Sequence, residues 1–258
     1  MLSGIPIPKD AVRPSETVLV NITPQETRVA VLEENNICEL HIERNSGHSL
    51  VGNIYLGVVK RVLPGMQSAF IDIGLERAAF LHIVDVLEQR RNPDETQRIE
   101  HMLFEGQSVL VQVIKDPINT KGARLSTQIS LAGRFLVHLP QEDHIGISQR
   151  IEDDAERNNL RERLNNLLPE NACHGYIIRT NAENASDDQL QSDINYLTKV
   201  WEHIQKQAKI QPPETLLYQD LPLSLRVLRD MFSLDTHKIL VDSTENHRRM
   251  TQFAEQYV

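Results

Sequence analysis

The chain has 258 residues, of which 40% are hydrophobic and 24% are charged, and its formal net charge is −9 at pH 7. This length predicts one or two domains with an ample core, and the composition is that of an ordinary soluble globular chain. The acid-rich balance counts against binding of long duplex DNA. A nucleic-acid binder with this charge must instead gather its cations into a local groove.

Two further features of composition restrict the class of protein. Cys38 and Cys173 lie far apart and form no CxxC pair, so we expect buried free thiols in a reducing compartment, and no disulfide framework or zinc knuckle. The first residues, MLSGIPIPKD, lack the apolar core of a signal peptide, and no run reaches transmembrane length. We therefore predict a cytoplasmic protein with no membrane partner.

The first fifty residues predict a small antiparallel sheet. Residues 1–14 carry three prolines and no periodicity, which is typical of a flexible lead-in. Apolar and polar residues then alternate over 17–22, 26–32 and 37–43, which predicts three strands. We expect the second reversal at Asn35-Asn36, because Asn tolerates a positive φ. The polar residues 44–48 make a plausible domain junction.

Residues 52–130 predict a five-stranded barrel of the OB type. Three apolar runs between 52 and 84 are separated by Pro64-Gly65 and by Gly74, which indicates a three-stranded meander. A charge-rich stretch, 87–104, predicts a helical or loop excursion. Two more strands follow at 108–115 and 123–130, joined by a loop with Lys121 at its tip. Five strands with an excursion after the third match an OB barrel.

Two phenylalanines of this meander are candidate binding residues. Ala69, Ile71 and Ile73 alternate with polar positions and with Phe70, so Phe70 points away from the core. Phe80 lies near His82 in the next run. Aromatic side chains on the outer face of a small barrel are what single-stranded nucleic acid stacks on, and the basic pair 60–61 is close by. The alternative is that both are core residues, since Phe is usually buried.

Residues 131–258 predict mixed α/β structure. We expect strands at 134–139, 175–179 and 238–241, and helices at 153–168, 223–232 and 245–257. A long helix should run from an N-cap at Ser186 to about residue 209, with its apolar positions on one face. The strand 175–179 ends on Arg179-Thr180, a guanidinium fork beside a hydroxyl, which suits a terminal phosphate. The alternative is an ordinary surface salt bridge.

No catalytic or metal-binding motif is found. The ten histidines show neither HxH nor HExxH spacing, and there is no phosphate-cradling GxxxxGK[ST] loop and no GxSxG elbow. No carboxylate pair on neighbouring strand ends presents a magnesium site. We therefore predict no catalytic residue, no metal ligand and no cofactor in this chain.

Several long segments together resemble one family. TPQETRVAVLEENNICELHIER, GNIYLGVVKRVLPGMQSAFIDIGLERAAFLH, KDPINTKGARLSTQISLAGRFLV, HIGISQRI and GYIIRTNAE occur in this order and are similar to the ribonuclease E/G family, from about residue 17 to the end. The resemblance implies an α+β protein: an S1-type OB barrel (48–130) inserted in an RNase H-like subdomain (1–47 and 221–258), with an α/β 5′-sensor subdomain (131–220).

The resemblance also implies roles for individual residues. Phe70, Phe80 and Lys121 occupy positions where the family contacts single-stranded RNA. Arg179 and Thr180 stand where the family grips a 5′-monophosphate, and two further residues, Gly133 and Val137, stand where backbone groups help to close that pocket. Leu56 departs from the pattern, since relatives usually carry lysine there.

The resemblance implies a metal-dependent endoribonuclease that acts on single-stranded RNA in rRNA processing and mRNA decay, as a homodimer or larger homo-oligomer. The family's two magnesium-binding aspartates and its zinc-binding link are not found in these 258 residues, so we expect this chain to be its RNA-binding, 5′-sensing part, inactive alone. Two alternatives stay open: a stand-alone RNA-binding module that does not cut, and an OB-type protein-interaction module with buried aromatics.

Overall fold

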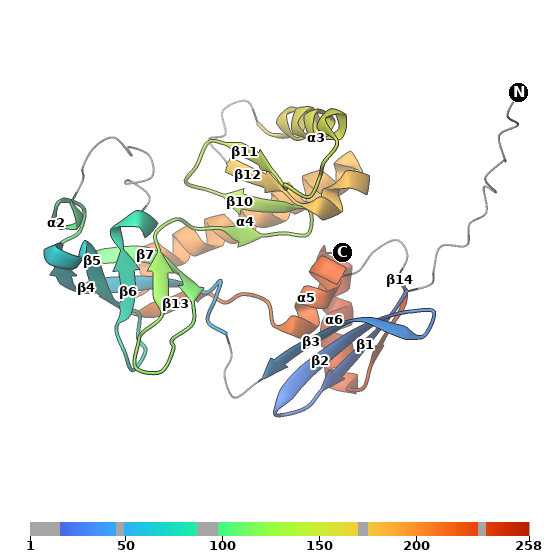
Figure 1. Ribbon diagram of the computed structural model, residues 1–258, viewed down its shortest axis with the longest axis horizontal. Helices are drawn as coiled ribbons and strands as arrows, with labels where there is room; N and C mark the ends of the chain where they lie inside the picture. The colour runs from blue at the N-terminus through green and yellow to red at the C-terminus, as the bar shows by residue number, and fades with distance from the viewer. Residues whose placement is uncertain (1–15, 45–48, 87–97, 170–174, 232–235, 258) are drawn as a thin grey trace, which may run out of the picture. The chain divides into compact units, whose positions relative to one another are not determined.

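The computed structural model describes residues 16–44, 49–86, 98–169, 175–231 and 236–257. The chain divides into two compact units, one built from residues 1–48 and 221–258 and the other from residues 49–220. Figure 1 labels most of the helices and strands of both. The first unit is thus assembled from two segments that flank the second in sequence.

A closed five-stranded barrel begins the second unit. Its strands are β4 (Ile54–Leu63), β5 (Ser68–Asp72), β6 (Ala79–His82), β7 (Ser108–Lys115) and β8 (Arg124–Ser126). They pair in the order β4-β5-β6-β8-β7, and β4 also pairs with β7, which closes the barrel. The predicted OB barrel is therefore confirmed. The 3-10 turns η2 (Pro64–Met66) and η3 (Ile83–Asp85) and helix α2 (Ile99–Met102) lie between strands.

The interior of the barrel follows the alternation in the sequence. Ala69, Ile71 and Ile73 are each at most 1% exposed, whereas Phe70 and Asp72 between them are more exposed, as the alternation of a pleated strand requires. Gly57 on β4 allows close approach of β5, because a Cβ there would lie 2.5 Å from a methyl carbon of Ile71. The barrel core therefore leaves Phe70 on the outer face.

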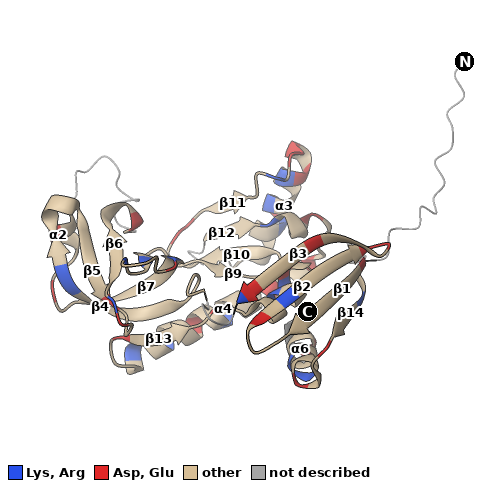
Figure 2. Ribbon diagram, turned by 60° about the horizontal axis from the view of Figure 1, so that its bottom comes forward, with Lys and Arg blue, Asp and Glu red and all other residues tan. Residues whose placement is uncertain are grey.

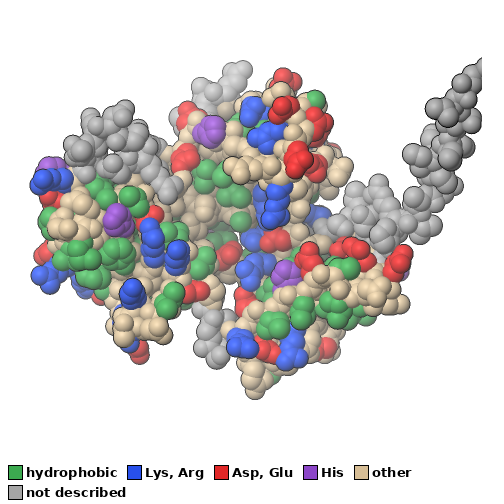
Figure 3. Space-filling model, viewed as in Figure 1, with side chains coloured by type: hydrophobic (Ala, Val, Ile, Leu, Met, Phe, Trp, Pro, Cys, Tyr) green, Lys and Arg blue, Asp and Glu red, His purple; other side chains and the backbone are tan. Residues whose placement is uncertain are grey.

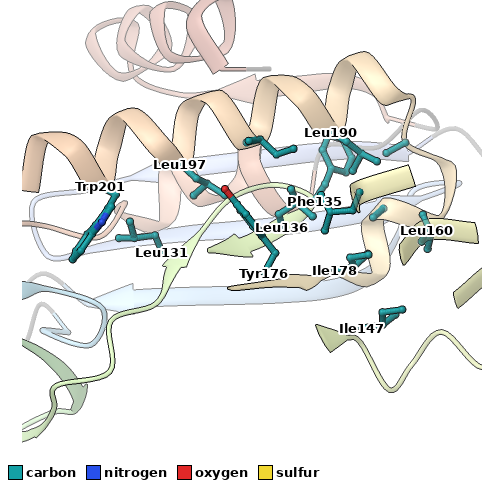
Figure 4. Packing of buried hydrophobic residues seen from close by; sticks show 14 of the residues in the cluster. Leu131, Phe135, Leu136, Ile147, Leu160, Tyr176, Ile178, Leu190, Leu197 and Trp201 are labelled. Carbon is teal, nitrogen blue, oxygen red and sulfur yellow. The ribbon is translucent and has the colours of Figure 1, made fainter. Parts of the chain in front are cut away.

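A mixed sheet covered by helices completes the second unit. Its strands are β9 (Leu131–Ala132), β10 (Leu136–Leu139), β11 (Ile145–Ile147) and β12 (Gly175–Ile178), in the order β11-β12-β10-β9. Helices α3 (Asp154–Leu167) and α4 (Asp187–Ile210) and the short η4 (Thr180–Asn184) accompany it, and β13 (Thr215–Tyr218) pairs with β4. Figure 4 shows Leu190, Leu197 and Trp201 of α4 packed over the sheet residues Leu131, Leu136 and Tyr176.

The first unit is a four-stranded sheet with helices. Strands β1 (Glu16–Ile22), β2 (Glu26–Glu33), β3 (Asn36–Arg44) and β14 (Thr236–Val241) pair in the order β14-β1-β2-β3. Helix α5 (Leu223–Arg226), the π-helical turn η5 (Val227–Met231) and α6 (Thr244–Tyr257) contribute to its core. The pairing of β1 with β14 is parallel and joins the two flanking segments. The predicted class, an OB barrel inserted in an α+β unit, is thus confirmed.

The structure corrects several local predictions. The reversal after β2 lies at Glu34-Asn35, where both residues have positive φ, one position before the predicted pair. Cys38 is exposed on β3, the edge strand of its sheet, so the expectation of a buried thiol is wrong for it; Cys173 lies outside the described residues. Strands β9, β11 and β13 were not predicted. Within the described residues, no helix is both long and apolar enough to cross a membrane.

Candidate nucleic-acid interface

A row of two aromatic residues between two basic ones crosses the outer face of the barrel. Phe70 on β5 pairs with Phe80 on β6, so their side chains lie on the same face. The row continues to Arg61 on β4, which pairs with Phe70, and to Arg124 on β8, which pairs with Phe80. Four adjacent strands thus present Arg61, Phe70, Phe80 and Arg124, which we call the outer row.

The two aromatic rings of the outer row touch each other and remain accessible. Their centroids lie 6.2 Å apart with an interplanar angle of 65°, an edge-to-face contact. Phe70 is 36% exposed and Phe80 is half-buried. The ring of His82 lies 6.3 Å from that of Phe80. The outer row therefore offers flat faces on which bases can stack.

The cations around the outer row differ in their partners. Arg124 is held by the buried carboxylate of Asp85, with 2.8 Å between Nη2 and Oδ2. Arg61 is exposed and makes no ion pair with another residue of the described ranges. Lys60, beside it, pairs instead with Asp72 at 3.2 Å and Glu214 at 2.9 Å. Figure 2 shows the basic stretch in β4, and Figure 3 shows basic, hydrophobic and histidine side chains together on the barrel.

Lys121 lies on a loop that packs against the start of β6. The loop is closed by backbone bonds between Ile118 and Lys121, and a Cβ at Gly122 would lie 2.1 Å from the carbonyl oxygen of Ala78. Lys121 is exposed and lies three residues before Arg124 of the outer row. The structure thus brings Phe70 and Phe80 into contact and places Lys121 on the neighbouring loop. Their RNA-binding role stays a prediction.

The second candidate site surrounds Arg179, at the end of β12. Its guanidinium donates through Nη1 to the carbonyl oxygen of Gly133 and lies 3.5 Å from that of Arg134. Its backbone N–H donates to the carbonyl oxygen of Phe135 at 2.8 Å. The turn between β9 and β10 therefore holds Arg179 at both its backbone and its side chain.

A buried carboxylate lies on the other side of the same turn. Asp193 of α4 is 8% exposed and accepts backbone N–H bonds from Arg134 (3.1 Å), Phe135 (2.8 Å) and Leu136 (2.8 Å). Burial raises the pKa of Asp193, while these three bonds and the charge of Arg179 act in the opposite direction. A Cβ at Gly133 would lie 2.5 Å from either carboxylate oxygen, so any larger residue there must displace the carboxylate.

The remaining predicted pocket residues lie around this turn. Thr180 follows Arg179, and its hydroxyl lies 3.2 Å from that of Ser148, after β11. Val137 lies on β10, where it pairs with Ala132 of β9. The structure therefore gathers Gly133, Val137, Arg179 and Thr180 at one corner of the sheet, while phosphate binding there stays a prediction.

Leu56, where the resemblance leads us to expect a lysine, is partly buried. It pairs with Thr215 and Leu110 and packs against the hydrophobic cluster that includes residues of β9, β10 and β12. A leucine there is explained by this apolar contact.

Sequence reasoning missed Arg124 and Asp193. Arg124 joins the outer row only through the parallel pairing of β6 with β8, which no local pattern signals. Asp193 lies on the buried face of α4, and in the sequence nothing distinguishes it from the other acidic residues of that helix. Only the fold brings it beneath the turn.

The comparisons with known proteins agree with this architecture. The family model described as ribonuclease E/G matches residues 130–258, which are 129 of the 258 residues. Over 248 residues, the chain is 41% identical to ribonuclease G of Haemophilus influenzae and 42% identical to that of Escherichia coli K12, covering 93% of this chain and 50% of each relative. It is 39% identical to ribonuclease E of Nostoc sp. over 237 residues, 92% of this chain and 34% of that relative.

The chain thus spans about half the length of the ribonucleases G that it matches. Half of its residues match the family model, and the barrel that the family resemblance implies is present. The chain belongs to the ribonuclease E/G family.

Proposed function

We propose that this chain is the RNA-binding and 5′-monophosphate-sensing part of an endoribonuclease that acts on single-stranded RNA in the cytoplasm, in rRNA processing and mRNA decay. The observation that carries the proposal is the outer row, in which two touching phenylalanines lie between two arginines. Membership of a ribonuclease family makes RNA the expected ligand of such a surface.

Bases of a single strand would stack on Phe70 and Phe80, and each stacked base contributes about 1–3 kcal/mol in proteins that bind in this way. Arg61 and Lys121 are exposed and would neutralise the adjoining phosphates. The 5′-monophosphate would bind the guanidinium of Arg179 and the hydroxyl of Thr180. Because a guanidinium forms paired hydrogen bonds with phosphate oxygens, a 5′-hydroxyl end would lose this part of the affinity.

The hydrolytic step is not assigned to residues of this chain. Across the described ranges, no three His, Cys, Asp or Glu side chains gather in a way that could hold a metal ion. We propose that the magnesium ion that the family resemblance implies is held by residues outside this chain, and we derive no step through it. We propose that the full-length protein supplies this chemistry and works as a homodimer or larger homo-oligomer.

The test compares single-stranded RNA that carries a 5′-monophosphate with the same RNA carrying a 5′-hydroxyl. Phe70→Ala and Phe80→Ala should each weaken binding of both RNAs by about fivefold to a hundredfold, since one stacked base is lost. Arg179→Ala should remove only the gain due to the phosphate. Phe104→Ala is the matched control, because Phe104 is 67% exposed but lies outside the outer row.

Each contrary outcome removes a defined part of the proposal. Equal binding of the two RNAs by the unmodified protein would refute the 5′-sensor assignment. Failure of both RNAs to bind would leave the protein-interaction module as the better description. Robust cleavage of RNA by this chain with magnesium would show that catalysis is not located elsewhere, whereas binding without cleavage also fits a stand-alone RNA-binding module.

A further inference from the structure

The turn Gly133–Leu136 lies between two charged side chains of opposite sign. The carboxylate of Asp193 accepts from the N–H groups of Arg134, Phe135 and Leu136. The opposite ends of the same peptide groups face Arg179. Successive N–H groups that converge in this way form an anion-binding nest, and here an internal carboxylate occupies it.

Each of the three peptide groups of the turn makes this double contact. In the peptide group between Gly133 and Arg134, the N–H donates to Asp193 at 3.1 Å and the carbonyl oxygen accepts from Nη1 of Arg179. In the group between Arg134 and Phe135, the N–H donates to Asp193 at 2.8 Å and the carbonyl oxygen lies 3.5 Å from Nη1 of Arg179. In the group between Phe135 and Leu136, the N–H donates to Asp193 at 2.8 Å and the carbonyl oxygen accepts from the backbone N–H of Arg179 at 2.8 Å.

These contacts have a direct consequence for Arg179. A carboxylate that binds the N–H end of a peptide group fixes that group's orientation and polarises its carbonyl oxygen toward a donor on the other side. Hydrogen bonds to charged groups are also shorter and stronger than neutral ones. The turn cannot rotate to release Arg179 without leaving the Asp193 carboxylate buried and short of partners.

Two further features restrict the turn. Phe135 is 7% exposed and belongs to the hydrophobic cluster under α4, as Figure 4 shows. Gly133 leaves room for the carboxylate, because a Cβ there would lie 2.5 Å from both oxygens.

We propose that Asp193 is a positioning residue for 5′-phosphate recognition, which holds Arg179 through the three peptide groups of the turn without touching the RNA. This inference rests on the proposed 5′-sensor function. It also predicts the opposite sign from simple electrostatics. Removing a negative charge near the pocket should strengthen binding of a phosphate if only charge matters, whereas loss of the support for Arg179 should weaken it.

The test measures the ratio of affinities for 5′-monophosphate and 5′-hydroxyl RNA. Asp193→Asn places an amide donor against at least one of the three N–H groups and should reduce this ratio by about tenfold, the order expected when a hydrogen bond to a charged group is lost. Affinity for 5′-hydroxyl RNA should be unchanged. Asp188→Asn is the matched control, because Asp188 is exposed on the same helix and should leave the ratio unchanged.

A second variant perturbs the same contact while keeping the charge. Gly133→Ala must displace the Asp193 carboxylate and should reduce the ratio in the same direction. Thermal unfolding of both variants shows whether each is folded, and if one is not, the other decides. A folded Asp193→Asn or Gly133→Ala variant with an unchanged or increased ratio would overturn the inference.

A measurement on Arg179 itself separates this inference from the proposed function. In nitrogen-15 NMR spectra, an anchored guanidinium gives its own resolved side-chain signals, and those of Arg179 should broaden or shift to solvent-like positions in Asp193→Asn but not in Asp188→Asn. If the unmodified protein shows no gain from a 5′-phosphate, the sensor function fails. These signals would then still decide whether Asp193 positions Arg179: unaltered signals in Asp193→Asn refute it.

Discussion

Gly122 and Gly65 show how differently two glycines of one barrel are constrained. A Cβ at Gly122 would lie 2.1 Å from the carbonyl oxygen of Ala78, whereas a Cβ at Gly65 would meet nothing within 4 Å. The first contact involves backbone on both sides and cannot be relieved by a rotamer change. Gly122 therefore sets the approach of the loop that carries Lys121.

Gly122→Ala should lower the free energy of unfolding by about 1–3 kcal/mol, because the loop and β6 must move apart. Gly65→Ala is the control and should change it by less than about 0.5 kcal/mol. Chemical denaturation of the two variants measures both values. Equal stability of the two would show that the loop adapts at little cost.

Asp72 should make stability depend on pH in the acid range. The N–H of Gly74, at 3.0 Å, and the ammonium group of Lys60 lower the pKa of Asp72 below its ordinary value of 3.8. A carboxylate with a depressed pKa stabilises the fold above its ordinary pKa, and this stabilisation is lost as the pH falls through the folded-state pKa.

Asp72→Asn should therefore be less stable than the unmodified protein at neutral pH, and the two should converge in acid. Urea denaturation across this pH range measures the difference. A difference that grows as the pH falls would contradict the assigned direction.

At the scale of elements, α4 packs against β9, β10, β13 and α3 of the second unit. Its buried face, which includes Leu190, Leu197 and Trp201, belongs to the cluster formed with the sheet β11-β12-β10-β9, and it also carries Asp193. Its start is set by a capping box, in which Ser186 accepts from the N–H of Gln189 and the Gln189 side chain accepts from the N–H of Ser186. The cap thus holds the helix end nearest to Arg179 in sequence.

Ser186→Ala should lower the free energy of unfolding by about 1 kcal/mol, because the N–H of Gln189 loses its acceptor. Ser192→Ala is the matched control on the same helix, since the Ser192 hydroxyl only donates to the carbonyl oxygen of Asp188 and alanine is the better helix former. Thermal unfolding compares the two, and an equal loss in both would argue against the capping box.

At the scale of the whole molecule, the hydrophobic clusters follow the division into two units. The clusters of the barrel and of the sheet β11-β12-β10-β9 lie entirely within residues 49–220, and a third cluster joins residues 18–31 to residues 223–250. The second unit therefore carries its own core. The first unit needs both flanking segments, because β1 pairs with β14.

A fragment of residues 49–220 should thus fold alone, with a cooperative thermal transition, and should bind single-stranded RNA as the longer chain does. A fragment of residues 16–48 should remain unfolded by circular dichroism, because its strands lack their partner and helices. Non-cooperative melting of the first fragment would show that it depends on contacts with the other unit.

The sequence by itself determined the strands of the barrel, the outward position of Phe70, the long capped helix and the family, because each is signalled by local alternation, helical periodicity or a contiguous motif. Tertiary structure alone decided which distant residues meet. Arg124 joins Phe80 through a parallel strand pairing, Lys60 is neutralised by Glu214 far along the chain, and Asp193 reaches Arg179 through a turn of three peptide groups. Such contacts depend on register and packing between elements, which no local pattern encodes.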